Sequence, residues 1–238
     1  MKLLAGVDLE NAQMLSTERV AYWYFRLNGF FQMENFIVHP ERRRGGQRTD
    51  ADLIGVRFPF RADRYVDTPE HPIQDDQDTL SLEEGWTEIV IVEVKRIERC
   101  TLNGPWTNPE NQNVQRVLAA IGCFETDRLD EVATEIYSTG LFEDEERKQR
   151  LRLIAVGREK NGKLLGDFPA VLQITWEEIL KFIGCRLYKY RSPKSDNKQW
   201  DDQIKLMQEI VQYCVKGQEF DDLKFVHICS EQLGIRKA

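Results

Sequence analysis

Glu93 and Lys95 stand two residues apart, directly after the apolar run IVIV (89–92). Successive side chains of a β-strand point to opposite faces, so these two charges would share one face and Val94 would lie on the other. Burying either charge without a partner costs several kcal/mol. The pair therefore requires an ion pair, water or a metal ion at the end of this strand.

An acidic residue two positions before a lysine has little meaning by itself, because the pattern occurs four times in the chain. The other three pairs are Glu146–Lys148, Asp196–Lys198 and Asp222–Lys224. These three lie in polar or charged surroundings, which are typical of solvated surface pairs. Only the pair at 93–95 follows an apolar strand, where a strand-end ion pair is the alternative to a functional site.

Asp50 and Asp52 alternate in the stretch TDADLIGV, so they also share a strand face. If this strand pairs with the one ending at Glu93, one of the two aspartates comes close to that glutamate. Two neighbouring carboxylates repel each other unless a proton or a cation lies between them. Mg²⁺ prefers oxygen ligands, and it lowers the pKa of a bound water that Lys95 could orient or deprotonate. Such a site is suited to the hydrolysis of a phosphodiester.

The hydrophobic pattern predicts an α/β fold in which strands place these residues and helices cover them. Asn161-Gly162 predicts a hairpin turn between the last two strands. The predicted strands cover residues 30–39, 49–58, 87–96, 150–157 and 170–175. The predicted helices cover residues 16–28, 108–124, 129–140, 175–190 and 200–217.

The composition indicates a sizeable globular chain of 238 residues, with 41% hydrophobic and 31% charged residues. No apolar run is long enough for a membrane span, and five scattered cysteines favour a reducing, cytoplasmic location. The net charge of −7 is local, because residues 65–84 hold seven acids and no Lys or Arg. Residues 39–64 hold seven arginines against four acids. The acidic stretch is expected to be a long surface insertion.

Glu18 in the first predicted helix, Asp52 and the Glu93/Lys95 pair follow one another in a distinctive order. In this order and strand context, the sequence resembles the PD-(D/E)xK nuclease superfamily, in particular its Holliday-junction-resolvase-like and Mrr-like restriction branch. The Pro of the family name is absent, because Ala51 precedes Asp52. The resemblance implies a restriction-endonuclease-like core, a central mixed β-sheet flanked by helices. It implies a nuclease-like domain over 1–190 with an insertion at 65–86, and leaves 191–238 as a C-terminal helical extension.

The resemblance also implies roles for individual residues. Asp52 and Glu93 would bind Mg²⁺ together with the Val94 carbonyl, and Mn²⁺ would substitute for Mg²⁺. Lys95 would position the attacking water or stabilise the transition state. Glu18 would bind a metal water or a second metal, or else only interact with the dipole of its helix. Asp50 competes with Asp52 for the ligand role.

Further candidates are less specific. Gln115, in the helix after the Glu93/Lys95 strand, matches a glutamine of some family members, but Ala119 replaces the tyrosine that follows it in one branch. Four arginines in a predicted turn could hold phosphates or could simply be solvated: Arg42, Arg43, Arg44 and Arg48. Trp106 could stack on a base, although packing is the more common role of a tryptophan.

The expected function is that of a metal-dependent DNA endonuclease leaving a 5′-phosphate and a 3′-hydroxyl, as the family implies. A bacterial defence or DNA-processing system would be consistent by analogy. The lack of an overall basic surface suggests a small footprint or targeting by a partner protein, and a homodimer is one possible assembly. The alternative is a catalytically inactive module of the same fold that binds nucleic acid or a partner protein.

Overall fold

The computed structural model describes residues 15–38, 49–64, 72–191 and 200–235. The helices are α1 (Thr17–Leu27), α2 (Gln77–Leu80), α3 (Gly104–Thr107), α4 (Asn113–Ile121), α5 (Leu129–Thr139), α6 (Gly162–Asp167), α7 (Trp176–Lys189), α8 (Asp202–Tyr213) and α9 (Asp222–Gln232). The strands are β1 (Phe31–Val38), β2 (Thr49–Arg57), β3 (Asp63–Arg64), β4 (Pro72–Ile73), β5 (Thr87–Val94), β6 (Leu141–Asp144), β7 (Gln149–Gly157), β8 (Leu172–Thr175), β9 (Val215–Lys216) and β10 (Glu219–Phe220).

A six-stranded mixed sheet forms the centre of the molecule. Five strands follow the order β1-β2-β5-β7-β6, and the sixth, β8, also pairs with β7. The pairs β1–β2, β2–β5 and β6–β7 are antiparallel, whereas β5–β7 and β7–β8 are parallel. Strands β6 and β8 pair with the two ends of β7. The prediction of an α/β fold with a central mixed sheet flanked by helices is thus confirmed.

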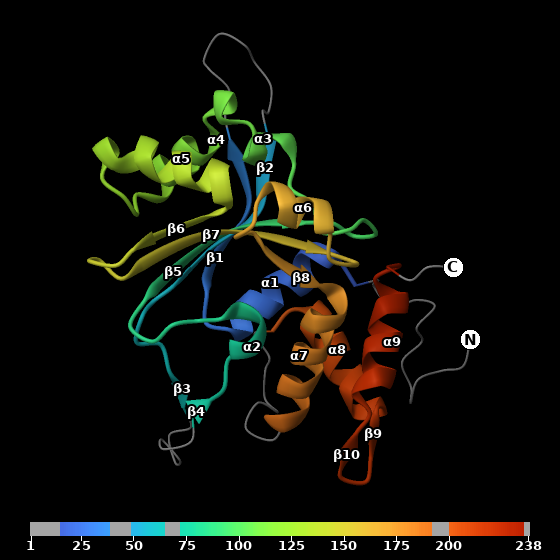
Figure 1. Ribbon diagram of the computed structural model, residues 1–238. Helices are drawn as coiled ribbons and strands as arrows, with labels where there is room; N and C mark the ends of the chain where they lie inside the picture. Colours follow the sequence, from blue (N-terminus) through green and yellow to red (C-terminus); the bar gives the residue numbers. More distant parts are fainter. Residues whose placement is uncertain (1–14, 39–48, 65–71, 192–199, 236–238) are drawn as a thin grey trace.

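Two hydrophobic cores cover the two faces of this sheet. One core joins the sheet to α1, α7, α8 and α9, and the other joins it to α4 and α5 (Figure 1). Strand β5 serves both, because Val90 and Val92 face the first core while Ile89 and Ile91 face the second. This explains why β5 is apolar on both faces, as is typical of a central strand.

Local capping residues set several helix boundaries, which lie close to the predicted ones. The Ser16 hydroxyl accepts a hydrogen bond from the N–H of Arg19 and begins α1. Gly29, with a φ of +82°, follows the end of that helix. Thr175 and Glu178 form the capping box of α7.

The connection between β7 and β8 differs from the prediction. Asn161-Gly162 does not form a hairpin turn, because β7 and β8 are parallel and parallel strands need a crossover. The Asn161 side chain instead accepts a hydrogen bond from the N–H of Lys163 and caps α6, which lies in that crossover. The same dipeptide chemistry that favours tight turns here begins a short helix.

Several further elements were not predicted. The charged run at 143–150 contains part of β6, which is an edge strand. Two carboxylates of β6 form ion pairs with arginines outside it: Asp144 with Arg128, and Glu143 with Arg150. The last predicted helix, at 200–217, ends earlier than expected, because α8 ends at Tyr213 and Val215 already lies in β9; the β9–β10 hairpin then leads into α9. Both α8 and α9 pack into the same core as α1 and α7.

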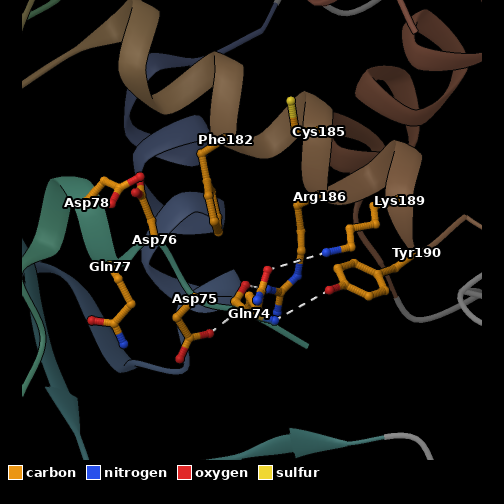
Figure 2. A pocket seen from close by; sticks show the side chains of 10 residues that line it. All are labelled: Gln74, Asp75, Asp76, Gln77, Asp78, Phe182, Cys185, Arg186, Lys189 and Tyr190. Atoms are coloured by element: carbon orange, nitrogen blue, oxygen red, sulfur yellow. Dashed lines mark hydrogen bonds and ion pairs between the residues drawn. The ribbon is translucent and has the colours of Figure 1, made fainter. Parts of the chain in front are cut away.

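The acidic stretch was expected to be a surface insertion, and its residues are described from 72 onward. In this part, at least one acidic side chain is buried and paired with arginines. The Asp75 side chain is only 6% exposed and pairs with Arg57 at 3.0 Å and with Arg61. A hollow of about 450 Å³ lies between α2 and α7, with Gln74 and Asp75 beside Arg186 (Figure 2). None of the predicted site residues lines this hollow.

A buried ion cluster links β5, β7 and the end of α2. Glu88 is fully buried, and its two carboxylate oxygens lie 3.1 Å from Arg150 Nη1 and 2.9 Å from Arg152 Nη2. Arg152 also donates to the Leu80 carbonyl at 2.7 Å. Burial lowers the pKa of the Arg152 guanidinium, although the Glu88 charge opposes this effect. The cluster therefore depends on the carboxylate of Glu88.

No described helix is both long and apolar enough to cross a bilayer.

Candidate functional site

The pairing of β2 with β5 places the predicted carboxylates together. Ile54 lies opposite Ile91 in the antiparallel register, and the side chains of both belong to the same core. Continuing the register by two residues sets Asp52 opposite Glu93 on that face. Asp52 Oδ2 also accepts a hydrogen bond of 2.6 Å from the backbone N–H of Val94. The end of β5 is thereby fixed against the start of β2.

Glu93 is the centre of this site and is only 3% exposed. Its Oε1 lies 2.5 Å from Lys95 Nζ and also accepts a hydrogen bond from the Asn103 amide. Its Oε2 accepts a hydrogen bond of 2.9 Å from the indole N–H of Trp106. Glu93 and Lys95 thus form an ion pair beside Asp52.

Two further residues, Asn103 and Trp106, contact the Glu93–Lys95 pair. Asn103 Oδ1 accepts a hydrogen bond of 2.9 Å from Lys95 Nζ, so this amide contacts both members of the ion pair. Asn103 precedes α3 but makes no side-chain capping bond there, which leaves its amide for the site. Trp106 is only 1% exposed, so its contacts are those of packing rather than of base stacking. The sequence contained one weak indication, an Asn-Gly-Pro-Trp loop shortly after the strand.

Burial changes the ionisation of both carboxylates. It raises the pKa of Glu93, and the nearby Asp52 charge adds to the rise, while Lys95 and the Trp106 N–H oppose it. It also raises the pKa of Asp52, against the opposing effects of the Val94 N–H and Lys95. Two desolvated carboxylates that disfavour joint ionisation form a site that a cation would stabilise.

Replacing Asp52 by Asn should raise the thermal stability of the metal-free protein near neutral pH, by about 2 °C or more. A carboxyl with a raised folded pKa binds more protons when folded, so its contribution to stability falls as pH rises through the unfolded and folded pKa values. The amide of the variant removes this cost and still accepts the Val94 hydrogen bond. The advantage of Asp52→Asn should therefore grow from acid to neutral pH.

Melting curves in EDTA across this pH range measure that difference. Glu145→Gln is the control, because Glu145 is 73% exposed and pairs only with Lys148 among the described contacts. A gap between Asp52→Asn and the wild type that is independent of pH would contradict the assigned pKa shift.

Glu18 lies at the start of α1 and is exposed. Burial of part of its side chain would raise its pKa, but hydrogen bonds from Ser16, its own backbone N–H and Thr17, together with the charge of Arg96, lower it. The Ser16 hydroxyl donates to Glu18 Oε2 at 2.6 Å. Glu18 influences Asp52 only through its charge, which raises the Asp52 pKa. The structure thus places Glu18 near the site, without a recorded hydrogen bond to Asp52 or Glu93.

The other predicted residues have different places. Gln115, on α4, donates a hydrogen bond of 3.5 Å to Asp130 and makes no recorded contact with Glu93. Asp50 is half-buried, and its charge raises the pKa of Asp52. The four predicted phosphate-binding arginines, at 42–44 and 48, lie outside the described residues.

Within the described part of the chain, no three His, Cys, Asp or Glu side chains group closely enough to hold a metal ion. Comparison of the chain with family models, with curated proteins and with solved structures gave no match.

Proposed function

We propose that this protein is a metal-dependent nuclease of the PD-(D/E)xK type that hydrolyses phosphodiester bonds in DNA. The observation that supports the proposal is the 2.6 Å hydrogen bond from the Val94 N–H to Asp52, which sets Asp52 beside Glu93, with Lys95 Nζ 2.5 Å from the Glu93 carboxylate. The β2–β5 register brings together residues that are about forty positions apart in the sequence. This is the arrangement that the sequence resemblance predicts.

The donor set fits a hard divalent cation. Asp52 and Glu93 supply carboxylate oxygens from adjacent strands, and the Val94 carbonyl is a third candidate ligand. Both carboxylates have raised pKa values, so a bound cation would relieve the cost of keeping them charged. When bound, Mg²⁺ or Mn²⁺ would lower the pKa of a water and neutralise charge on a phosphate. Glu18 remains a candidate for contact through a metal-bound water.

The residues of the chain have separate roles in this proposal. Lys95 orients the attacking water and stabilises the developing charge on the phosphate. Asn103 holds the Lys95 amine by a hydrogen bond, and Trp106 holds Glu93 by another, so both act as positioning residues. Cleavage would leave a 5′-phosphate and a 3′-hydroxyl, as the family resemblance implies.

The test is cleavage of a supercoiled plasmid. With Mg²⁺ or Mn²⁺ the wild-type protein should nick or linearise the plasmid, and with EDTA it should not. Asp52→Asn should reduce the rate by at least about a hundredfold, since a lost metal ligand costs several kcal/mol of transition-state stabilisation. Glu145→Gln should cut like the wild type. Equal cutting by Asp52→Asn, or cutting that persists in EDTA, would remove the proposal.

One observation favours the second candidate function, an inactive module of this fold that binds nucleic acid or a partner protein. Both Glu93 oxygens already accept hydrogen bonds, from Lys95, Asn103 and Trp106. The pair could therefore be a structural ion pair that requires no metal. In that case Mg²⁺ and Mn²⁺ would leave the melting temperature unchanged, whereas a metal site would raise it in the wild type more than in Asp52→Asn.

A further inference from the structure

Two loops at the C-terminal ends of β5 and β7 form a basic surface beside Lys95. Residues 95–100 and 157–160 carry five cationic side chains and two acidic ones. We call Arg96, Arg99 and Arg158 the basic platform. Since the whole chain has a net charge of −7, the local excess of positive charge in these two loops is a specific feature.

The backbone of the platform is tightly fixed. The N–H of Arg158 donates to the Glu98 carbonyl at 2.8 Å, and the N–H of Cys100 donates to the Glu159 carbonyl at 2.9 Å. Gly157 permits this contact, because a Cβ there would lie 2.6 Å from the Cys100 nitrogen. The two loops therefore run side by side with little freedom to separate.

The platform is also anchored to the candidate site. The indole N–H of Trp176, at the start of α7, donates to the carbonyls of Lys95 and Arg96 at 2.9 and 3.1 Å. The charge of Arg96 lowers the pKa of Glu18, so this guanidinium interacts with one of the predicted site residues. The platform thus begins at the residue that follows Lys95.

The platform has more guanidinium groups than carboxylates that pair with them. Arg99 Nε and Arg158 Nη2 share a single oxygen, Glu159 Oε1, at 3.0 and 3.3 Å. No ion pair is recorded for Arg96 or for Glu98 among the described residues, and Arg96 is exposed. Each guanidinium presents five N–H donors, so most of the donors of this platform are available to a ligand.

Lys160 is not part of the platform. Its amine pairs with Glu178 at 2.9 Å, and this carboxylate also caps α7. The free donors are therefore those of arginines, whose planar fork suits bidentate contact with phosphate oxygens.

We propose that Arg96, Arg99 and Arg158 bind consecutive phosphates of the nucleic-acid backbone on the side of the site next to Lys95. The inference rests on the proposed function for its ligand class, but binding is measurable without cleavage. Phosphate contacts of this kind fix the register of the strand and carry no sequence information. They would hold the backbone so that one phosphodiester lies over Glu93 and Lys95.

The experiment is fluorescence anisotropy with a labelled DNA duplex in EDTA. Arg99→Gln/Arg158→Gln should weaken binding by about tenfold and reduce the slope of log K against log salt by about two, because two phosphate contacts are lost. Single-stranded DNA and RNA of the same sequence, measured in parallel, identify which backbone the platform prefers.

The matched control is Arg147→Gln/Lys148→Asn, which removes two charges just before β7, at its opposite end. Lys148 has a φ of +50°, a conformation that Asn tolerates. This control should bind like the wild type. Equal weakening by the control, or binding within about twofold of the wild type by the platform variant, would overturn the inference.

The outcomes separate this inference from the nuclease proposal. Wild-type binding that is lost in the platform variant, without any Mg²⁺-dependent cleavage, would support the platform and reject the nuclease. Cleavage that the platform variant performs as efficiently as the wild type at low DNA concentration would support the nuclease and reject the platform.

Discussion

Under the proposed function, replacing Lys95 by Met is expected to lower Mg²⁺-dependent cleavage by about two to three orders of magnitude, the usual effect of losing a group that stabilises charge in the transition state. Lys95 Nζ contacts Glu93 and Asn103, and no other cation is recorded within hydrogen-bond reach of Glu93 in the described structure. Lys95→Arg should not restore activity, because a planar guanidinium cannot replace a compact ammonium at this position. Single-turnover cleavage measured at saturating DNA isolates the chemical step.

The pH dependence of the same variant gives a second test. Lys95 lowers the pKa of Glu93, so Lys95→Met should raise it further. Under the proposed function, metal binding requires an ionised Glu93 and would be lost as pH falls through that pKa. Mn²⁺ binding, measured by calorimetry, should therefore be lost at a higher pH in Lys95→Met than in the wild type. If both Lys95 variants cleaved DNA at the wild-type rate, Lys95 would have no role in cleavage beyond its ion pair with Glu93.

Replacing Glu88 by Gln is expected to lower the free energy of unfolding by about 3–5 kcal/mol, which is typical of breaking a buried ion pair from one side. Arg150 would keep Glu83 and Glu143 as partners. Arg152 is 7% exposed and would lose its direct carboxylate partner, Glu88, while keeping the Leu80 carbonyl. Urea denaturation measures the loss.

A second substitution tests this explanation. Adding Arg152→Met to Glu88→Gln removes the uncompensated charge and should recover part of the lost stability. Glu145→Gln is again the control, since an exposed pair contributes about 0–1 kcal/mol. A Glu88→Gln protein within about 1 kcal/mol of the wild type would show that Arg152 finds another partner or releases its charge.

The sequence predicted the carboxylate pair because the periodicity of two strands is a local property. Asp52 and Glu93 each follow from alternation within their own strand, and β2 and β5 are neighbours in the sheet. Asn103 could not be predicted in the same way. It reaches Glu93 because the chain turns back after β5, and no periodic pattern records that turn.

The missed elements also have physical causes. β6 is a short edge strand in which only Phe142 is buried, so it lacks the alternation of an interior strand. In α9 the described buried residues are Phe225, Cys229 and Gln232, a sparse pattern for a helix. The misassigned turn at Asn161 shows that dipeptide propensity is overridden when the flanking strands are parallel.

The parallel joint between β5 and β7 also determines how the sheet assembles. Strands β1, β2 and β5 pair antiparallel with one another. By contrast, Glu88 on β5 and Arg150 on β7, which meet across the parallel joint, are 62 residues apart in the sequence. Bringing two strands this far apart in the sequence together costs loop-closure entropy before their contacts can stabilise the pair, so long-range parallel pairing slows folding. The joint would then be the late, rate-limiting step, and the ion cluster around Glu88 would form only when the two halves of the sheet meet.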